Sequence, residues 1–261
     1  MKHSTPTTPK PIEAKSILLV GPPGGMKTTL AMQFPRVGFL DCDRNLDGAE
    51  RFLRTKLKDL DYVYEAVTYE TKGDKEVPVP IVECFDRLLL VLDEAKSWPT
   101  STIVVDGLTS INEFIIQKVL KDQGGKTAMD IRDWGPFQSK MIQLVAARFR
   151  SLGRNVILTA HAKAIERKLK GRDGKDTMET VLDHYEIDIP SSIHQRFGGY
   201  FTDIWATYPK QLTGSRMGYR MQFNPDEKYG CKNTFGLQDM DVEQGALAWP
   251  LIKDTVMKGL L

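Results

Sequence analysis

Four short apolar runs, separated by polar and glycine-containing segments, set the pattern of this chain. They cover residues 16–20, 37–41, 102–106 and 155–161. Runs of this length that are rich in Val, Ile and Leu predict β-strands covered on both faces, as the strands of a parallel sheet are.

Segments with helical periodicity lie between or beside these runs. The expected helices cover residues 28–34, 82–96, 111–120 and 136–152. In the second of them Leu88, Leu89 and Leu92 fall on one face. The alternation of strands and helices predicts an α/β fold, with a mostly parallel twisted sheet and helices on both faces.

Other segments give weaker patterns. Residues 62–80 predict a β-hairpin with its turn at Lys72-Gly73-Asp74, and residues 200–207 and 218–223 predict later strands. Residues 162–190 are polar and mixed in charge, and no internal repeat occurs.

The pattern also predicts the domain organisation. Residues 1–14 are polar, contain prolines and predict a flexible tail. We expect one domain over residues 15–261, with a core at about 15–236 and a C-terminal extension at 237–261.

Composition excludes several classes of protein. No apolar run reaches the ~18 residues of a membrane-spanning helix, so no membrane association is expected. Cys42, Cys84 and Cys231 are far apart and form no Cys-x-x-Cys pair, which argues against a disulfide framework or a zinc site and fits a reducing cytoplasm. The net charge is only +2, so any contact with nucleic acid must come from a local basic patch.

A glycine-rich loop directly follows the first apolar run. It matches the phosphate-loop pattern Gly-x4-Gly-Lys-Ser/Thr, except that Met26 stands where the second glycine is usual. Backbone N–H groups of such a loop cradle phosphates, a lysine reaches the β- and γ-phosphates, and a hydroxyl binds Mg²⁺. The expected ATP-binding residues are Gly21, Pro22, Pro23, Gly24, Gly25, Met26, Lys27, Thr28 and Thr29.

Two aspartates follow four apolar residues and could help to hold Mg²⁺ beside Thr28. Asp93 lies within a segment of helical periodicity, whereas Asp106 ends a β-branched run just before a glycine. Since this carboxylate belongs at the carboxyl end of a strand beside the phosphate loop, we predict Asp106.

With these motifs in order, residues 15–236 resemble the RecA-like ATPases, and most of all the phage single-strand annealing proteins with a minimal RecA core. Residues 39–47, Phe-Leu-Asp-Cys-Asp-Arg-Asn-Leu-Asp, resemble the RecA segment that carries the general base. The resemblance places Asp43 at the position of a family glutamate, one methylene shorter; Asp41 is the next candidate. It also places His161 at the end of a strand where RecA has a γ-phosphate-sensing glutamine.

The resemblance implies DNA contacts after His161, where RecA has its second DNA-binding loop. The basic residues there are Lys163, Arg167, Lys168, Lys170, Arg172 and Lys175. A basic loop can follow a phosphate backbone, but the same charges could instead pair within a solvated hairpin. A weaker counterpart of the first DNA-binding loop lies at residues 121–133.

Residues 232–236, Lys-Asn-Thr-Phe-Gly, resemble a Lys-x-Arg-x-Gly stretch that reaches into a neighbour's ATP site in RecA-like proteins. Lys232 is kept, and Thr234 replaces the arginine. The resemblance therefore implies a homo-oligomer, ring or filament, with ATP at its subunit interfaces.

The sequence thus predicts an Mg²⁺- and ATP-dependent protein that promotes annealing or strand pairing of single-stranded DNA in the cytoplasm, of the host if phage-encoded. A single-strand DNA-binding protein is a plausible partner. The alternatives are a ring-helicase motor, a small-molecule kinase, and a nucleotide-bound assembly protein with weak ATPase activity, which Met26 and Asp43 both permit.

Overall fold

The computed structural model describes residues 14–170 and 176–260, and its centre is a nine-stranded sheet. Six strands run parallel in the order β9-β1-β7-β6-β2-β3. They are β9 (Asp203–Gln211), β1 (Ser16–Gly21), β7 (Asn155–Lys170), β6 (Thr102–Asp106), β2 (Val37–Asp41) and β3 (Tyr62–Ala66). The prediction of a mostly parallel α/β sheet is confirmed.

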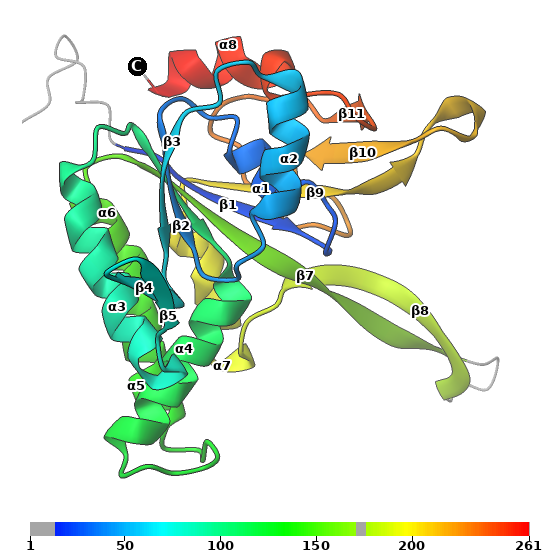
Figure 1. Ribbon diagram of the computed structural model, residues 1–261. Helices are drawn as coiled ribbons and strands as arrows, with labels where there is room; N and C mark the ends of the chain where they lie inside the picture. Colours follow the sequence, from blue (N-terminus) through cyan, green and yellow to red (C-terminus); the bar gives the residue numbers. More distant parts are fainter. Residues whose placement is uncertain (1–13, 171–175, 261) are drawn as a thin grey trace, which may run out of the picture.

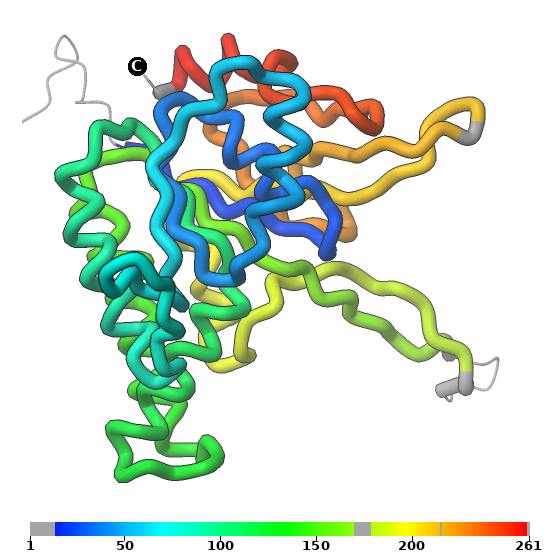
Figure 2. Tube along the Cα trace, in the orientation of Figure 1, coloured from blue at the N-terminus to red at the C-terminus, as the bar shows by residue number. Residues whose placement is uncertain are grey.

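Antiparallel strands extend the sheet at two places. β10 (Met217–Gln222) pairs with β9, and β11 (Met240–Glu243) pairs with β10. β8 (Asp176–Ile187) pairs with the outer part of β7. The β7–β8 hairpin and the β9–β10 hairpin both project from the same side of the body (Figure 2).

Helices cover both faces of the sheet (Figure 1). One layer contains α3 (Ile81–Glu94), α4 (Leu108–Asp122), α5 (Trp134–Ile142), α6 (Phe149–Ser151) and α7 (Ser191–Phe197). The other contains α1 (Lys27–Ala31), α2 (Asp47–Lys56) and α8 (Trp249–Leu260). Short helical turns complete the chain: η1 (Ala95–Ser97), η2 (Gln143–Arg148, a π-helix), η3 (Gly198–Tyr200) and η4 (Thr213–Ser215).

The alternation of side chains along β1 explains this layering. Leu18 and Val20 pack into the core beneath α3 and α4, whereas Ile17 and Leu19 pack into the core on the opposite face. Because both faces are buried, the strand is apolar at every position from 17 to 20, as the sequence predicted.

The C-terminal extension belongs to the second of these cores. Val242, Ile252 and Val256 are buried there together with Leu30 of α1. The extension therefore covers the helix that follows the glycine-rich loop. No helix among the described residues is both long and apolar enough to cross a membrane.

Several predicted elements differ in the structure. β3 is an edge strand paired with β2, and the hairpin is the smaller β4 (Tyr69–Lys72) with β5 (Lys75–Pro78). A half-buried edge strand and a hairpin arm share the same alternating pattern, so the sequence did not separate them.

The loop implied after His161 is instead a hairpin, the alternative that the sequence left open, because β7 continues through Lys170 and pairs with β8. Polar residues outside the core still form a strand there, since β8 supplies backbone partners. The strand expected at 200–207 begins only at Asp203, after η3, and the helix expected at 28–34 is the shorter α1.

Candidate nucleotide-binding site

The strand order brings the predicted site residues to one edge of the sheet. β7 lies between β1 and β6, with Gly21 opposite His161, and Asp41 lies opposite Asp106 across β2 and β6. A pocket at these carboxyl ends is lined by residues 23–29 of the loop and by Asp43, Asp106 and His161, among others. We call it the candidate pocket.

Packing against β9 explains two glycines of the loop, Gly21 and Gly25. A Cβ on Gly21 would lie 2.0 Å from the carbonyl oxygen of Thr207, and a Cβ on Gly25 would lie 2.7 Å from that oxygen. The Thr207 hydroxyl donates a 2.6 Å hydrogen bond to the Gly25 carbonyl. Sequence reasoning missed Thr207, because nothing near it in the chain signals a contact 182 residues away.

Met26 occupies a conformation that usually requires glycine. Its φ is 66°, in the left-handed region, immediately before α1 begins at Lys27. Gly24 has a φ of 72°, so the loop visits this region twice. Met26, which replaces the second glycine of the phosphate-loop pattern, therefore adopts a backbone conformation that glycine favours.

The Lys27 side chain folds back onto the loop. Its ammonium donates hydrogen bonds to the carbonyls of Gly21 and Pro22, each at 2.9 Å. Burial lowers the pKa of this ammonium, while the carboxylates of Asp106 and Asp43 oppose that shift. Two neutral carbonyls hold a buried cation, so an incoming phosphate would offer it a stronger acceptor.

Asp106 is the buried carboxylate of the candidate pocket. It accepts hydrogen bonds from the hydroxyls of Thr28, at 2.8 Å, and Thr159. Burial raises its pKa to about 6, and the two hydroxyls act in the other direction. The rival Asp93 instead lies exposed on α3, where it pairs with Lys96 and Arg148.

The Thr28 hydroxyl and the Asp106 carboxylate fit an Mg²⁺ site. Mg²⁺ takes oxygen ligands and commonly uses few protein groups together with water and substrate phosphates. Within the described residues no cluster of three or more His, Cys, Asp or Glu side chains could hold a metal. Water and the phosphates of a nucleotide would supply the other ligands.

Asp41 and Asp43 are two residues apart but have different environments. The Asp41 carboxylate accepts the backbone N–H groups of Asp43, at 3.1 Å, and Arg44, at 2.6 Å, and is 1% exposed. Asp43 faces the candidate pocket, where a Cβ on Gly107 would lie 2.5 Å from its carboxylate. Asp41 thus shapes the loop, and Asp43 is available for chemistry.

Arg44 points away from the candidate pocket. Its guanidinium lies 3.7 Å from the centre of the Tyr69 ring and 2.5 Å from the carboxylate of Glu76, both on the β4–β5 hairpin. The arginine next to Asp43 is therefore engaged elsewhere.

His161 ends the parallel part of β7 beside the loop. Its Nδ1 is buried and has no hydrogen-bond partner. Burial, and then the charge of Lys27, lower the pKa of the ring, so the imidazole is neutral at pH 7. A neutral ring can donate one hydrogen bond to a phosphate oxygen or to water.

Several lining residues carried no signal in the sequence. They are Asn45, Gly48, Ala49, Gly107, Leu108, Thr159, Ala160 and Tyr219. Tyr219 is the one aromatic residue of the lining; it comes from β10, which only the fold brings near the loop.

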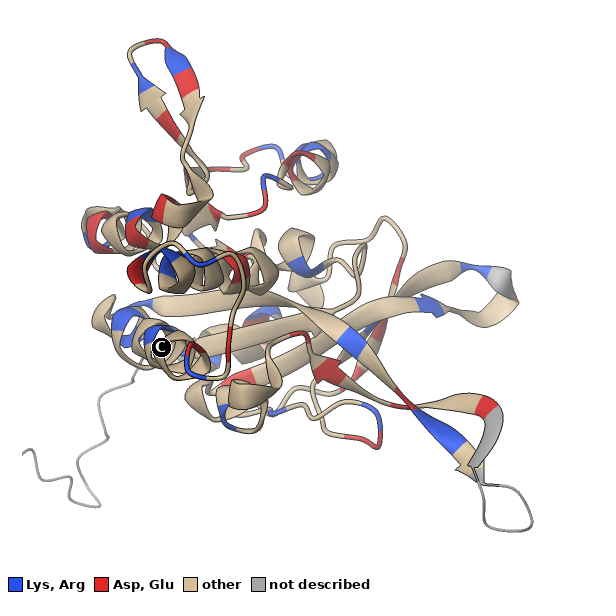
Figure 3. Cartoon of the chain, turned by 90° about the horizontal axis from the view of Figure 1, so that it is seen from below, with Lys and Arg blue, Asp and Glu red and all other residues tan. Residues whose placement is uncertain are grey.

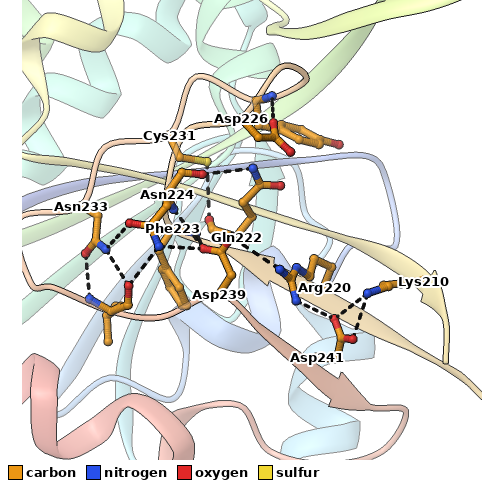
Figure 4. Close-up of polar contacts among 12 residues, drawn as sticks. Lys210, Arg220, Gln222, Phe223, Asn224, Asp226, Cys231, Asn233, Asp239 and Asp241 are labelled. Carbon is orange, nitrogen blue, oxygen red and sulfur yellow. Dashed lines mark hydrogen bonds and ion pairs between the residues drawn. The ribbon is translucent and has the colours of Figure 1, made fainter. Parts of the chain in front are cut away.

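Lys232 lies at the opposite edge of the sheet. Its ammonium donates a 2.7 Å hydrogen bond to the carbonyl of Phe201, and neighbouring Thr202 pairs with Ser16 at the start of β1. The next residue, Asn233, is fixed by its side-chain amide, which donates to the Leu237 carbonyl at 2.7 Å and to the Asn224 side-chain oxygen at 3.1 Å (Figure 4). Within one chain the fold does not bring Lys232 to the candidate pocket.

The predicted DNA-binding residues lie mainly on β7. Lys163, Arg167 and Lys168 are exposed, and Arg167 forms a 2.9 Å ion pair with Asp183 of β8. Positive and negative residues both occur along the hairpin (Figure 3). Lys170 ends β7, and Arg172 and Lys175 lie outside the described residues.

Comparison with known proteins identifies a family and a similar solved structure. Residues 13–235 match the family described as an AAA domain. Among solved structures, the chain is similar to a KaiC-like protein, PH0186, from the hyperthermophilic archaeon Pyrococcus horikoshii OT3. The identity is 12%, the TM-score is 0.47, and the match covers 88% of this chain and 85% of that chain. No curated protein matches the chain.

Proposed function

Because the chain belongs to the AAA-domain family of P-loop ATPases, we propose that it hydrolyses ATP with Mg²⁺ and thereby promotes annealing or strand pairing of single-stranded DNA. The observation that carries the proposal is the convergence of Lys27, Thr28, Asp43 and Asp106 on one pocket at the carboxyl ends of adjacent strands. That edge is where open α/β sheets bind their ligands.

The predicted site residues of the candidate pocket have distinct tasks in this chemistry. Lys27 and the loop N–H groups neutralise and orient the phosphates. Thr28 and Asp106 would hold Mg²⁺, which supplies charge stabilisation on the transferring phosphoryl group. Asp43 accepts a proton from the attacking water, and His161 donates a hydrogen bond from a neutral ring.

The β7–β8 hairpin supports the DNA part of the proposal. It continues the strand that carries His161 and presents Lys163, Arg167 and Lys168 outside the globular body. Exposed cations of this kind bind a phosphate backbone by releasing counterions. The ion pair with Asp183 reduces the share of Arg167, so Lys163 and Lys168 carry more of the contact.

The proposal includes self-assembly. A phosphoryl-transfer site needs further positive charge on the γ-phosphate, and Arg44 is engaged with Glu76 in the same chain. The proposed donor is Lys232, which lies at the far edge of the sheet and would act on a neighbouring copy in a ring or filament. A single-strand DNA-binding protein remains a proposed partner. The proposed compartment is the cytoplasm, that of the host cell if the protein is phage-encoded.

ATPase activity measured with and without single-stranded DNA tests the proposal. We expect Mg²⁺-dependent release of phosphate that the DNA stimulates, with no transfer to small molecules. Slow turnover that DNA does not change would favour a nucleotide-dependent assembly protein instead, the alternative that the strained Met26 supports.

Charge reversal tests the role of the hairpin. Changing Arg167, Lys168 and Lys170 to Glu should weaken single-strand binding and flatten its salt dependence, because fewer counterions are released. The matched control reverses Lys56, Lys58 and Lys253, three exposed lysines elsewhere on the surface. Equal losses in both triple variants would mean that only net charge matters.

A further inference from the structure

Thr159 is a polar residue inside an otherwise apolar stretch of β7. The neighbouring residues Val156, Ile157, Leu158 and Ala160 are apolar and buried, and Thr159 itself is 1% exposed. Because a buried hydroxyl without a partner carries a desolvation cost, a threonine at such a place indicates a hydrogen bond.

The partner of this hydroxyl is the carboxylate that we assign to Mg²⁺. On β7, Thr159 lies on the same face as Ile157, which is buried in the core that includes α1. On the neighbouring β6, Asp106 lies on the same face as Val104, which belongs to that core. The Thr159 hydroxyl donates a hydrogen bond to Oδ1 of Asp106.

The two oxygens of Asp106 have separate donors. Oδ1 accepts from Thr159, and Oδ2 accepts from the Thr28 hydroxyl at 2.8 Å. Thr28 is itself expected to bind Mg²⁺, so its hydroxyl has two tasks. The Thr159 hydroxyl has one, because within residues 14–170 and 176–260 it bonds to Asp106 alone.

An uncharged donor suits this position. A cation in place of the hydroxyl would neutralise the carboxylate and compete with the metal for it. The nearby cation, Lys27, donates instead to the carbonyls of Gly21 and Pro22. A hydroxyl fixes the orientation of the carboxylate and leaves its charge for the metal.

We propose that Thr159 is a positioning residue for Mg²⁺, whose hydroxyl holds the Asp106 carboxylate in the orientation in which Asp106 and Thr28 receive the metal. Hydrogen-bond partners of metal ligands orient those ligands, and losing one typically costs roughly 10–100-fold in metal affinity or activity. The inference rests on the proposed Mg²⁺-dependent ATPase function and adds to it a residue that acts through Asp106.

Thr159→Val tests the inference, because valine has nearly the shape of threonine but lacks the hydroxyl. The measurement is the Mg²⁺ concentration needed for half-maximal binding of a fluorescent, non-hydrolysable ATP analogue. We expect this concentration to rise at least about 10-fold. The affinity for the analogue in EDTA should be unchanged, since the hydroxyl acts on the metal ligand and not on the phosphate loop.

A conservative variant and a matched control locate the effect. Thr159→Ser keeps the hydroxyl and should keep the wild-type Mg²⁺ requirement. Thr102 of β6 is also buried, but its hydroxyl has no hydrogen-bond partner among the described residues, so Thr102→Val should leave the requirement unchanged. Chemical denaturation shows whether each variant is folded, and Thr159→Ala replaces Thr159→Val in the comparison if valine prevents folding.

A wild-type Mg²⁺ requirement in folded Thr159→Val would overturn this inference and leave the proposed function intact. Equal increases in Thr159→Val and Thr159→Ser would also overturn it, because the hydroxyl would then not be the group that matters. A wild-type chain that binds and hydrolyses ATP equally well without Mg²⁺ would overturn the proposed function and this inference together.

Discussion

Asp41 and Asp43 show how two like residues at the end of one strand take different tasks. Asp41 is buried and its carboxylate accepts backbone N–H groups, so it holds the turn after β2. Asp43 has its carboxylate at the candidate pocket, against a glycine that leaves room for it. Gly107 is thus as much a part of the site as the residues that could react.

Asp43→Asn should separate binding from chemistry. The amide keeps the size of the side chain but cannot accept a proton, so hydrolysis should fall by roughly 10²-fold or more while ATP still binds. Asp41→Asn should instead lower the free energy of unfolding by about 1–3 kcal/mol, because a buried acceptor is weakened. ATPase assays, nucleotide titrations and chemical denaturation check both. Equal turnover in Asp43→Asn and wild type would assign the base elsewhere.

The raised pKa of Asp106 predicts how the Mg²⁺ requirement depends on pH. Its pKa is about 6, so the carboxylate is ionised above that pH and increasingly protonated below it. Protons then compete with the metal, and the Mg²⁺ concentration for half-maximal ATPase should rise as the pH falls from 7 to 5.5. Magnesium titrations at several pH values measure this. A requirement that is flat over that range would show that Asp106 does not help to hold the metal.

At the scale of elements, the sequence predicted the parts of the fold whose residues are buried on both faces. The bounds of β1, β2 and β6 were predicted within one residue, because short continuous apolar runs are typical of strands that are buried on both faces. The glycine-rich loop was equally predictable, since all residues of its motif are close together in the sequence. His161 was found only through the family resemblance.

Contacts between distant elements were not predictable. The outer half of β7 is polar and forms a strand only because β8 returns beside it. Thr207 and Tyr219 reach the loop from β9 and β10, and no periodicity or motif marks them.

The close approach of β1 and β9 predicts an intolerant glycine. Gly21→Ala would place a methyl group 2.0 Å from the Thr207 carbonyl oxygen, which is backbone and cannot rotate away. We expect the free energy of unfolding to fall by about 1–3 kcal/mol, as for other overpacked sites, with weaker ATP binding.

Gly135→Ala is the matched control. Gly135 lies in the first turn of α5, just before Pro136, with nothing within 4 Å of an added Cβ, so alanine should change the free energy of unfolding by less than about 1 kcal/mol. Chemical denaturation of both variants measures the difference. A Gly21→Ala chain as stable as wild type would mean that β9 does not pack closely against Gly21.

At the scale of the whole molecule, the candidate pocket and Lys232 lie at opposite edges of the sheet. A head-to-tail contact would bring the Lys232 edge of one copy to the pocket of the next, and contacts of that type build rings or helical filaments. One chain thus has both the candidate pocket and Lys232, but only a second copy would bring a Lys232 to that pocket.

Mixing two inactive variants tests this arrangement. Lys27→Ala and Lys232→Ala should each have little ATPase activity, and co-assembled mixtures should regain part of it, because some interfaces pair an intact Lys27 with an intact Lys232. A mixture of Lys27→Ala with Asp43→Asn is the control, since both changes affect the same pocket. Co-assembly without recovery would show that Lys232 does not act on a neighbour.

The most direct test of the account is ATP hydrolysis by Lys27→Ala. Loss of the cation that meets the phosphates should reduce turnover by at least about 10²-fold and weaken ATP binding, while the fold survives. Lys253→Ala, which removes an exposed lysine of α8, serves as the control and should be fully active. The measurement is phosphate release at saturating Mg²⁺ and ATP. Wild-type turnover in a correctly folded Lys27→Ala chain would contradict the assignment of this pocket as the ATPase site.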